Sequence, residues 1–312
     1  MITPSPMLHH FTGDGHPYIQ GALTADDLRR FLDRLGTFRI MQAHDYEAAA
    51  RDGSLQPGEI CLTFDDALKS QSDIAAPVLA ERGLTAFFFV YSQPFVAPSP
   101  VSFEVQRYFR NRHFKTPEQF YPEFYSTARK AGLSAAVDRA LTTEEAQSWL
   151  AEYSFYSEGD RRFRFFRDQL VTPEVYAELM IEMLAAHSVD VTALAREIWM
   201  TDEDLRTLAD AGHCIGLHSY SHPTTLGSLP PGVQEEEYRA NARHLTDVLG
   251  ARPSVMSHPS NSYSAHTLKI LQDLGVTVGF RSNATMKDPW NLELPRLDHL
   301  EFTAKTGAAY AA

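Results

Sequence analysis

Cysteine is scarce in this chain, because only Cys61 and Cys214 occur among 312 residues. Each stands inside a short apolar run that is typical of a strand, so we interpret both as small buried hydrophobic residues rather than as a disulfide or a metal-binding pair. The N-terminus has neither the basic start nor the apolar run of a secretory signal, and no later run approaches the roughly 20 apolar residues of a membrane span. These absences predict a cytoplasmic protein without a transmembrane segment.

Positive charge is also in short supply. The chain has 28 Lys and Arg against 40 Asp and Glu, a net charge of −12, which argues against nucleic acid as a partner because phosphate binding needs a basic face. The sequence contains no Gly-x-Gly-x-x-Gly or Walker pattern, which argues against a nucleotide as a cofactor. What remains is a globular chain long enough for one barrel-sized α/β domain with an insertion.

Strand-like apolar runs alternate with helix-like segments outside the middle of the chain, which predicts a parallel α/β barrel. The expected strands are 60–64, 86–91, 213–217, 255–258 and 276–280, and the expected helices are 24–35, 72–82, 202–211, 234–249 and 264–274. Capping residues stand near several helix starts and a glycine stands just past several helix ends, as at Ser264 and Gly275.

The middle of the chain has a different character, rich in aromatic residues and arginine. Apolar spacings of three and four, and Thr-Pro-Glu sequences at 116–118 and 172–174, predict several helices there. We therefore divide the chain into a barrel made of residues 1–92 and 199–312 and a helical insertion at 93–198. We expect the insertion either to pack against the barrel or mediate formation of a homo-oligomer, or to cover a functional cleft as a lid.

Polar residues follow two of the expected strands. Asp65 and Asp66 end one apolar run, and His218 and His222 follow another. Taken alone, an Asp pair is more typical of a turn and a His pair of a solvated surface. At the shared carboxyl edge of a parallel sheet, however, they offer one carboxylate and two imidazoles to a divalent metal, with a second carboxylate left to accept a proton from water. The sequence therefore predicts metal-assisted hydrolysis.

These segments also resemble a known family. The stretches 63–66 (Thr-Phe-Asp-Asp) and 218–223 (His-Ser-Tyr-Ser-His-Pro) are similar to the first two motifs of the polysaccharide deacetylase family, also called the NodB homology domain or carbohydrate esterase family 4. The resemblance implies a distorted (β/α) barrel. It further implies a metal held by Asp66, His218 and His222, with Zn²⁺ as the expected ion and another divalent transition metal as the alternative, and Asp65 as general base.

The third family motif departs from the pattern. In the family an arginine stands two residues before a proline, whereas here Ser257 precedes Pro259. We expect Arg296, or failing that Arg281, to orient the base instead. The loop after the proline is expected to supply a backbone N–H to the developing oxyanion, and the candidate substrate-binding residues in it are Pro259, Ser260, Asn261 and Tyr263.

The family usually supplies a late histidine as general acid for the departing amine. His299 is the nearest match by position and is the first choice. His10, at the end of the expected first strand, and His258, in the third-motif loop, are the alternatives. A structural role for each of these histidines is the competing interpretation.

The resemblance and the motifs together imply a hydrolase that removes an N-acetyl group from an amino sugar. Because a cytoplasmic location is expected, the predicted substrate is a saccharide precursor, either a nucleotide sugar or a lipid-linked saccharide. The aromatic residues and arginines of the insertion would then stack on sugar rings and meet a phosphate or carboxylate. The alternatives are a deformylase or another non-peptide C–N amide hydrolase, and a catalytically silent carbohydrate-binding protein.

Overall fold

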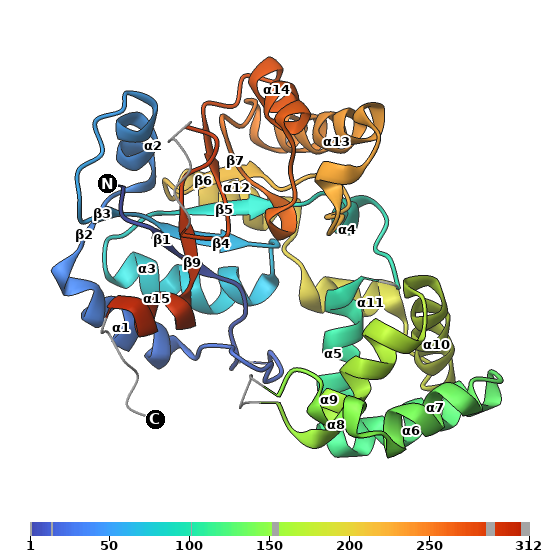
Figure 1. Cartoon of the computed structure of the whole chain (residues 1–312). Coiled ribbons are helices and arrows are strands. Elements are labelled where there is room, and N and C mark those ends of the chain that lie inside the picture. Colours follow the sequence, from blue (N-terminus) through green and yellow to red (C-terminus); the bar gives the residue numbers. More distant parts are fainter. Residues whose placement is uncertain (1, 14, 101, 152–155, 285–290, 307–312) are drawn as a thin grey trace. The chain divides into compact units, whose positions relative to one another are not determined.

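The computed structural model of the chain describes residues 2–13, 15–100, 102–151, 156–284 and 291–306. The chain divides into two compact units (Figure 1), Met1–Ala97 with Arg196–Ala312, and Pro98–Ala195. We call the first the barrel unit and the second the helical unit. Within the described ranges, no helix is both long and apolar enough to cross a membrane.

The barrel unit is built on a sheet of seven parallel strands in the order β8-β7-β6-β5-β4-β1-β9. A parallel bridge between Phe280, the last residue of β8, and Leu294, just before β9, nearly closes the sheet on itself. This architecture confirms the predicted fold class, the distorted (β/α) barrel. The strands are β1 (Ser5–Leu8), β4 (Leu62–Asp65), β5 (Ala86–Val90), β6 (Cys214–Leu217), β7 (Val255–Ser257), β8 (Val278–Phe280) and β9 (Arg296–Asp298), beside a small separate pair of β2 (Arg39–Ile40) and β3 (Glu59–Ile60).

Successive side chains of each strand point alternately into the barrel and out toward the helices. In β5, Phe89 belongs to an inner cluster of buried side chains and Phe88 to an outer one. In β6, Cys214 belongs to the inner cluster and Leu217 to the outer one. Gly216 lies between these two residues of β6, and a Cβ there would lie 2.6 Å from the ring of Phe89. The absence of a side chain at this position makes room for that ring.

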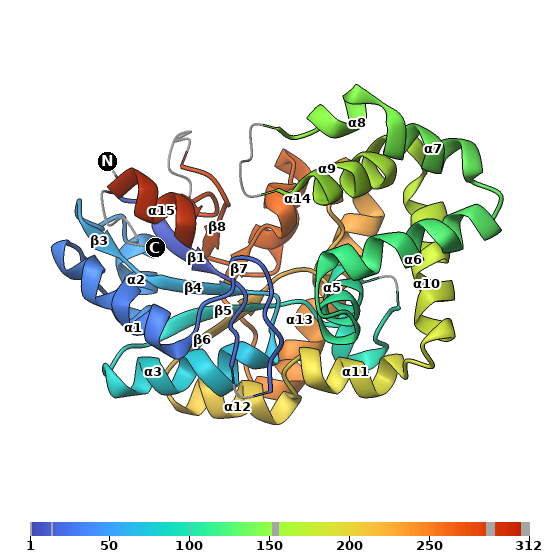
Figure 2. The same cartoon turned by 90° about the horizontal axis from the view of Figure 1, so that it is seen from below.

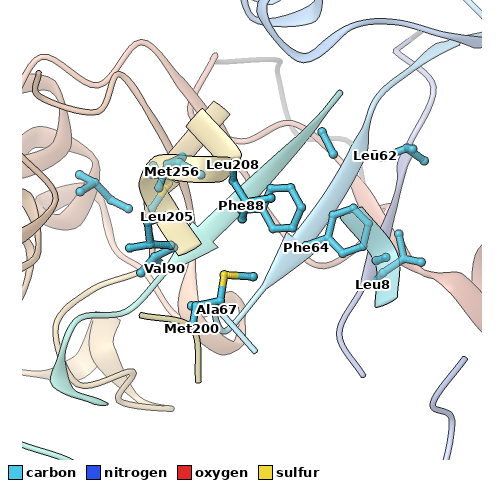
Figure 3. Close-up of a cluster of buried hydrophobic side chains, with 14 of the residues drawn as sticks. Leu8, Leu62, Phe64, Ala67, Phe88, Val90, Met200, Leu205, Leu208 and Met256 are labelled. Atoms are coloured by element: carbon cyan, nitrogen blue, oxygen red, sulfur yellow. The ribbon is translucent and has the colours of Figure 1, made fainter. Parts of the chain in front are cut away.

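The outer cluster is the main hydrophobic core and lies between the strands and the helices that cover them (Figure 3). Leu8, Phe64 and Phe88 from three neighbouring strands pack in it with Leu205 and Leu208 of α12 (Asp202–Asp210). The rings of Phe64 and Phe88 stack at 4.7 Å. Because burying one such side chain contributes about 1.5–3 kcal/mol, this core fixes which residues of each strand point outward, and hence which point inward.

The inner cluster fills the amino-terminal end of the barrel. Ala43, Tyr46 and Ala50, on one face of α2 (Ala43–Arg51), pack in this cluster, and the ring of Tyr46 stacks on Phe280 at 6.0 Å. Figure 1 shows α2 near the end of the sheet where β4 and β5 begin. Apolar side chains therefore occupy the inward positions at the amino end.

The helices of the barrel unit begin and end close to the predicted positions. Thr24 and Thr201 cap α1 (Ala25–Arg34) and α12 through capping boxes with Asp27 and Asp204. Gly250 ends α13 (Pro231–Leu249) in the left-handed conformation. Figure 2 shows α1, α3 and α12 along one side of the sheet. The remaining elements are η1 (Leu35–Thr37), η2 (Gln71–Ala75), α3 (Ala76–Glu81), α4 (Gln93–Val96), η4 (Leu226–Ser228), η5 (Pro259–Asn261), α14 (Ala265–Asp273) and α15 (His299–Thr306).

The helical unit is held together by aromatic side chains. Phe163 meets Phe124 and Phe120 edge to face at 5.0 and 5.4 Å. Helices α6 and α10 begin at Pro117 and Pro173, in the two Thr-Pro-Glu sequences that predict helix starts. The helices are α5 (Phe103–His113), α6 (Pro117–Lys130), α7 (Ser134–Thr142), α8 (Glu144–Ser148), α9 (Glu158–Phe165), η3 (Phe166–Leu170), α10 (Pro173–Ala186) and α11 (Val191–Ile198), which contains the boundary with the barrel unit. The roles of this segment as a lid or in oligomerisation stay predictions.

Candidate metal centre and active site

The carboxyl end of the barrel gathers polar side chains from four strands. The residues before Asp65 and His218 point outward into the main core, and so these two side chains point inward. Ser257 from the end of β7 and Arg296 from the start of β9 meet Asp65 there. The alternation that the apolar core imposes therefore brings a carboxylate, an imidazole, a hydroxyl and a guanidinium to one place.

Asp66, His218 and His222 form a compact group of three potential metal ligands. Oδ1 of Asp66 lies 3.6 Å from Nε2 of His218 and 3.5 Å from Nε2 of His222, and the three donor atoms lie within 4.8 Å of one another. His218 is buried, whereas Asp66 and His222 are partly exposed. The structure thus brings together the three ligands that the family resemblance implies, and their role in binding a metal stays a prediction.

The surroundings of His218 suit a metal ligand. Its Nδ1 lies 2.9 Å from the carbonyl oxygen of Ser257, which can only accept, so Nδ1 carries the proton and Nε2 presents its lone pair toward Asp66. Burial lowers the pKa of His218 to about 4. The imidazole is therefore neutral at pH 7, the form that binds Zn²⁺, and the donor set fits a divalent transition metal.

Two residues of α13 that the sequence analysis did not single out hold the loop between the two histidines. Glu237 accepts hydrogen bonds from the amide of Tyr220 and from the amide and hydroxyl of Ser221 at 2.7–3.0 Å. Asn241, one helical turn further on, is fully buried, and its Oδ1 accepts a hydrogen bond from the amide of His218 at 2.9 Å. The sequence signal that could have identified them is an asparagine on the apolar face of a helix, four residues after a glutamate.

Asp65 is held by a two-pronged ion pair with Arg296. Nη1 and Nη2 of Arg296 lie 2.7 and 2.8 Å from the two carboxylate oxygens, and both side chains are buried. Burial alone would raise the pKa of Asp65, but the Arg296 guanidinium and, after it, His218 outweigh burial and lower this pKa well below its usual range. Asp65 is therefore an ionised carboxylate in a fixed orientation, and the arginine that was expected to orient it contacts it directly.

Ser257, which stands where the family resemblance would place an arginine, contacts Arg296. The Ser257 hydroxyl accepts a hydrogen bond from Nη2 of Arg296 and lies 3.4 Å from Oδ2 of Asp65. Arg296 also donates from Nη1 to Thr63 Oγ1 at 3.2 Å and from Nε to the carbonyl oxygen of Arg281 at 2.9 Å. Arg281, the second candidate for orienting the base, thus contacts Arg296 through its backbone.

The segment after β4 differs from the predicted single helix. A continuous helix over 72–82 is expected, but the segment begins with a π-helical turn, η2, and such turns are frequent at functional sites. Nε2 of Gln71, the first residue of η2, donates to the carbonyl oxygens of Asp65 at 2.6 Å and His9 at 2.8 Å. The buried Gln71 side chain therefore ties the ends of β1 and β4 together beneath the site.

Backbone strain is concentrated in the loops that carry these residues. A φ near +60° is unfavourable for a residue with a Cβ and costs about 1–3 kcal/mol where the surrounding contacts enforce it. Asp66 has φ 78° and His222 has φ 56°. Most of the described non-glycine residues with positive φ lie after β4, β6 and β7, namely Asp66, Ala67, Ser219, His222, Ser260 and Asn261. Strain at these strand ends indicates that the loop shapes serve the site rather than stability.

His299, the first choice for the general acid, follows β9 and begins α15. Its ring is buried and lies edge-on to Phe31 of α1 at 6.5 Å, and its Nδ1 lies 3.5 Å from Asp298. Burial lowers the pKa of His299. His10, one alternative, is partly buried and its ring stacks with that of His9 at 6.2 Å. These positions do not decide between them, and each catalytic assignment stays a prediction.

His258 and Tyr263 pack together in the third-motif loop. Their rings stack at 4.0 Å, and Nε2 of His258 lies 2.9 Å from the carbonyl oxygen of Leu292. Burial lowers the pKa of His258 to about 3, so its ring is neutral near pH 7. The Tyr263 hydroxyl donates to Glu293 at 2.5 Å. Substrate binding by this loop stays a prediction for Pro259, Ser260, Asn261 and Tyr263.

Solved structures share this fold over nearly the whole chain. IcaB from Ammonifex degensii is 15% identical with a TM-score of 0.57, over 99% of this chain and 96% of that one. A de-N-acetylase from Aggregatibacter actinomycetemcomitans is 11% identical with a TM-score of 0.56, over 95% of each chain. The deacetylase PplD of Streptococcus pyogenes, solved with acetate, is 14% identical with a TM-score of 0.54, over 95% of this chain and 91% of that one. At these identities the likeness establishes the fold.

Sequence comparison adds a family. The model of the family described as polysaccharide deacetylase matches residues 168–279, a segment that contains His218 and His222 but neither Asp65 nor Arg296. The uncharacterized protein YlxY of Bacillus subtilis (strain 168) is 28% identical over 97 residues, which are 30% of this chain and only 30% of YlxY. The family model and the solved structures thus agree with the predicted resemblance to polysaccharide deacetylases. Residues 168–279 therefore match the polysaccharide deacetylase family, and the fold over nearly the whole chain is that of the solved deacetylases.

Proposed function

We propose that this protein is a metal-dependent N-deacetylase of an amino sugar, with Asp66, His218 and His222 as the metal ligands. The observation that supports this most is the grouping of two imidazoles and one carboxylate within 4.8 Å of one another, next to an ionised, arginine-bound Asp65. Two nitrogens and one oxygen suit zinc, our preferred ion. When bound, such an ion supplies a Lewis acid that polarises the amide carbonyl and acidifies water.

In this proposal Asp65 is the general base. Its carboxylate is ionised at neutral pH and accepts the proton of the attacking water, while the bidentate contact keeps both oxygens in place. Arg296 then carries the positive charge that holds the carboxylate before and after proton transfer. Asparagine at position 65 would keep the shape of the side chain and remove the base.

The third-motif loop is proposed to bind the acyl group. The amides of Asn261 and Ser262 already donate to carbonyl oxygens within the loop, at 3.2 and 2.8 Å, so we assign the oxyanion to the amide of Ser260. The general acid that protonates the departing amine is proposed to be His299, with His10 and His258 as its rivals. Replacing each by glutamine and measuring the basic limb of the pH profile of kcat would identify which one carries the proton.

For the substrate, we propose a saccharide precursor that bears phosphate, as a nucleotide sugar or a lipid-linked saccharide. An observation within the helical unit supports this choice, because Arg107, Arg110, Arg164 and Arg167 line one cavity of about 80 Å³. Glu104 pairs with Arg107 and Asp168 with Arg167, but among the described residues no carboxylate forms an ion pair with Arg110 or Arg164. This excess of positive charge suits a phosphate or carboxylate. The cytoplasmic location stays a prediction.

Acyl release tests the activity. Wild type and Asp65→Asn are loaded with zinc and incubated with N-acetylated and N-formylated amino sugars, each as free saccharide, nucleotide sugar and lipid-linked saccharide. We expect acetate release by the wild type and a loss of at least about a hundredfold in Asp65→Asn, with equal metal content in both. Asp33→Asn, an exposed carboxylate, is the control.

Each other result has a distinct meaning. Formate released in preference to acetate would replace the deacetylase by a deformylase that uses the same residues. No release from any substrate by a fully metal-loaded wild type would favour a carbohydrate-binding protein. For the phosphate preference, Arg110→Gln with Arg164→Gln should weaken the binding of phosphate-bearing saccharides, whereas Arg129→Gln, on the exposed surface of the same unit, should not.

A further inference from the structure

A second group of potential metal ligands lies at the other end of the barrel. His44 and Glu47 stand one helical turn apart on α2, and Cys214 is the first residue of β6. Sγ of Cys214 lies 3.3 Å from Nδ1 of His44 and 3.8 Å from the nearer carboxylate oxygen of Glu47. That oxygen lies 3.7 Å from the same Nδ1. One nitrogen, one oxygen and one sulfur therefore face one another.

These separations match a tetrahedral zinc site. With Zn–S of about 2.3 Å and Zn–N and Zn–O of about 2.0–2.2 Å at tetrahedral angles, the ligand atoms stand about 3.3–3.6 Å apart. The three distances around His44, Glu47 and Cys214 agree with these edges to within about half an ångström. They also resemble the 3.5 and 3.6 Å separations around Asp66 at the other site. An ion can therefore be placed between the three donors without moving the backbone.

The surroundings hold Glu47 and Cys214 in place and leave the side of His44 open to solvent. The other carboxylate oxygen of Glu47 accepts a hydrogen bond from Ser254 Oγ at 2.5 Å, which orients the carboxylate as an outer contact does at many metal sites. Cys214 is buried, with 4% of its surface exposed. The side chain of His44 is 69% exposed, so an ion and a completing water have access from solvent.

We propose that His44, Glu47 and Cys214 form a second binding site, for a thiophilic divalent ion of the zinc class. Binding replaces the thiol proton of Cys214 by the metal and releases that proton to solvent. The ion would fasten α2 to the first residue of β6, at the end of the barrel where Ala43 and Tyr46 of α2 enter the inner core. Its role is therefore structural.

This site is distinct from the candidate active site and does not rest on the proposed function. Cys214 and His218 both point inward from the same chain segment, but they stand four positions apart along extended chain, which is about 13 Å. The interpretation of Cys214 as a buried hydrophobic residue is correct as to burial. That interpretation did not include metal binding, because His44 and Glu47 lie about 170 residues away from Cys214 in the sequence, on α2.

Cobalt substitution of the full chain separates the two sites. A thiolate bound to Co²⁺ gives an intense sulfur-to-cobalt charge-transfer band in the near ultraviolet, and the Asp66 site contains no sulfur. We expect this band in the wild type and in Cys61→Ala, the matched control at the other buried cysteine, and its absence in Cys214→Ser. His44→Ala, a change at an exposed residue that leaves the core intact, should abolish or strongly weaken the band.

Metal content provides the second measurement. The zinc bound per chain should fall by one equivalent in Cys214→Ser and in His44→Ala, whereas His222→Ala should lose a different equivalent and keep the cobalt–sulfur band. A wild type without the band, or a band unchanged in His44→Ala, would overturn the second site. Failure of the proposed deacetylase activity would leave both of these results unaffected, so the two proposals are tested separately.

Discussion

Replacing Arg296 with glutamine removes one partner of the buried ion pair that holds Asp65. Arg296 has no exposed surface, and its two terminal nitrogens contact the two oxygens of Asp65 at 2.7 and 2.8 Å. Its remaining hydrogen bonds go to Thr63, Ser257 and the backbone of Arg281. Glutamine cannot reproduce the fork or the charge, so the variant leaves an uncompensated carboxylate inside the barrel.

The expected cost follows from that burial. Removing one partner of a buried ion pair destabilises a protein by about 3–5 kcal/mol, because the other charge stays buried without compensation. The matched control is Arg239→Gln, which removes a surface pair with Glu235 in which both side chains are about half exposed. Such pairs are worth about 0–1 kcal/mol. The two arginine variants should therefore differ by at least about 2 kcal/mol in the free energy of unfolding.

Urea unfolding of the metal-free protein at pH 7 measures this difference. The fluorescence of Trp199, in the barrel unit, reports on the relevant unit once Trp149 and Trp290 are replaced by phenylalanine. The double variant Asp65→Asn with Arg296→Gln should be more stable than Arg296→Gln alone, because it no longer buries an unpaired charge. A cost below about 1 kcal/mol for Arg296→Gln, or purely additive effects in the double variant, would refute the reasoning.

The pH dependence provides a further check with a definite sign. The folded-state pKa of Asp65 lies below its unfolded-state value of about 3.9, so the unfolded chain takes up the proton first as the pH falls. The stabilisation by the pair is therefore fully present above about pH 4 and is lost as the pH falls further. Wild type should lose more stability than Arg296→Gln between pH 4 and about pH 2. Equal losses would contradict the assignment.

Three more predictions concern the supports of the site and of the core. Glu237→Gln should weaken zinc binding about 10–100-fold in calorimetric titration, because the loop between the metal-binding histidines loses its carboxylate acceptor, and the exposed Glu236→Gln should change nothing. Gly216→Ala should lower the free energy of unfolding in urea by about 1–3 kcal/mol, because its Cβ would lie 2.6 Å from the ring of Phe89. In Gly232→Ala the new Cβ has no atom within 4 Å, so this variant should be neutral or stabilising. Burial lowers the pKa of His213 to about 4 from 6.5, so the stabilisation by the neutral imidazole is complete above pH 6.5 and is lost as the pH falls toward 4. The urea midpoint of the wild type should therefore fall over this pH range more than the midpoint of His213→Gln. Parallel curves for the two proteins would contradict the prediction.

The elements of the barrel could be predicted because the signals that define them are local. The expected helix 264–274 is α14, Ala265–Asp273, and the expected strand 86–91 is β5, Ala86–Val90. Apolar periodicity, a capping serine and a following glycine all act within a few residues of the element that they define. The π-helical turn at Gln71 was not predicted, because its glutamine bonds to the ends of two strands, one of them more than 60 residues away.

The sequence by itself determined which residues the site can use. Asp65 ends one strand and Asp66 follows it, and His218 and His222 lie in the loop after another strand. In a parallel sheet such positions share one edge, so their grouping followed from local pattern. The family resemblance named Arg296 as a partner of the base, but the contacts that hold these residues were decided by tertiary structure. Arg296 reaches Asp65 across 231 residues of sequence, and Glu237 binds the histidine loop from a helix. Those pairings depend on strand order, register and the inward side of each strand, which the packing of the whole core fixes and no local pattern records.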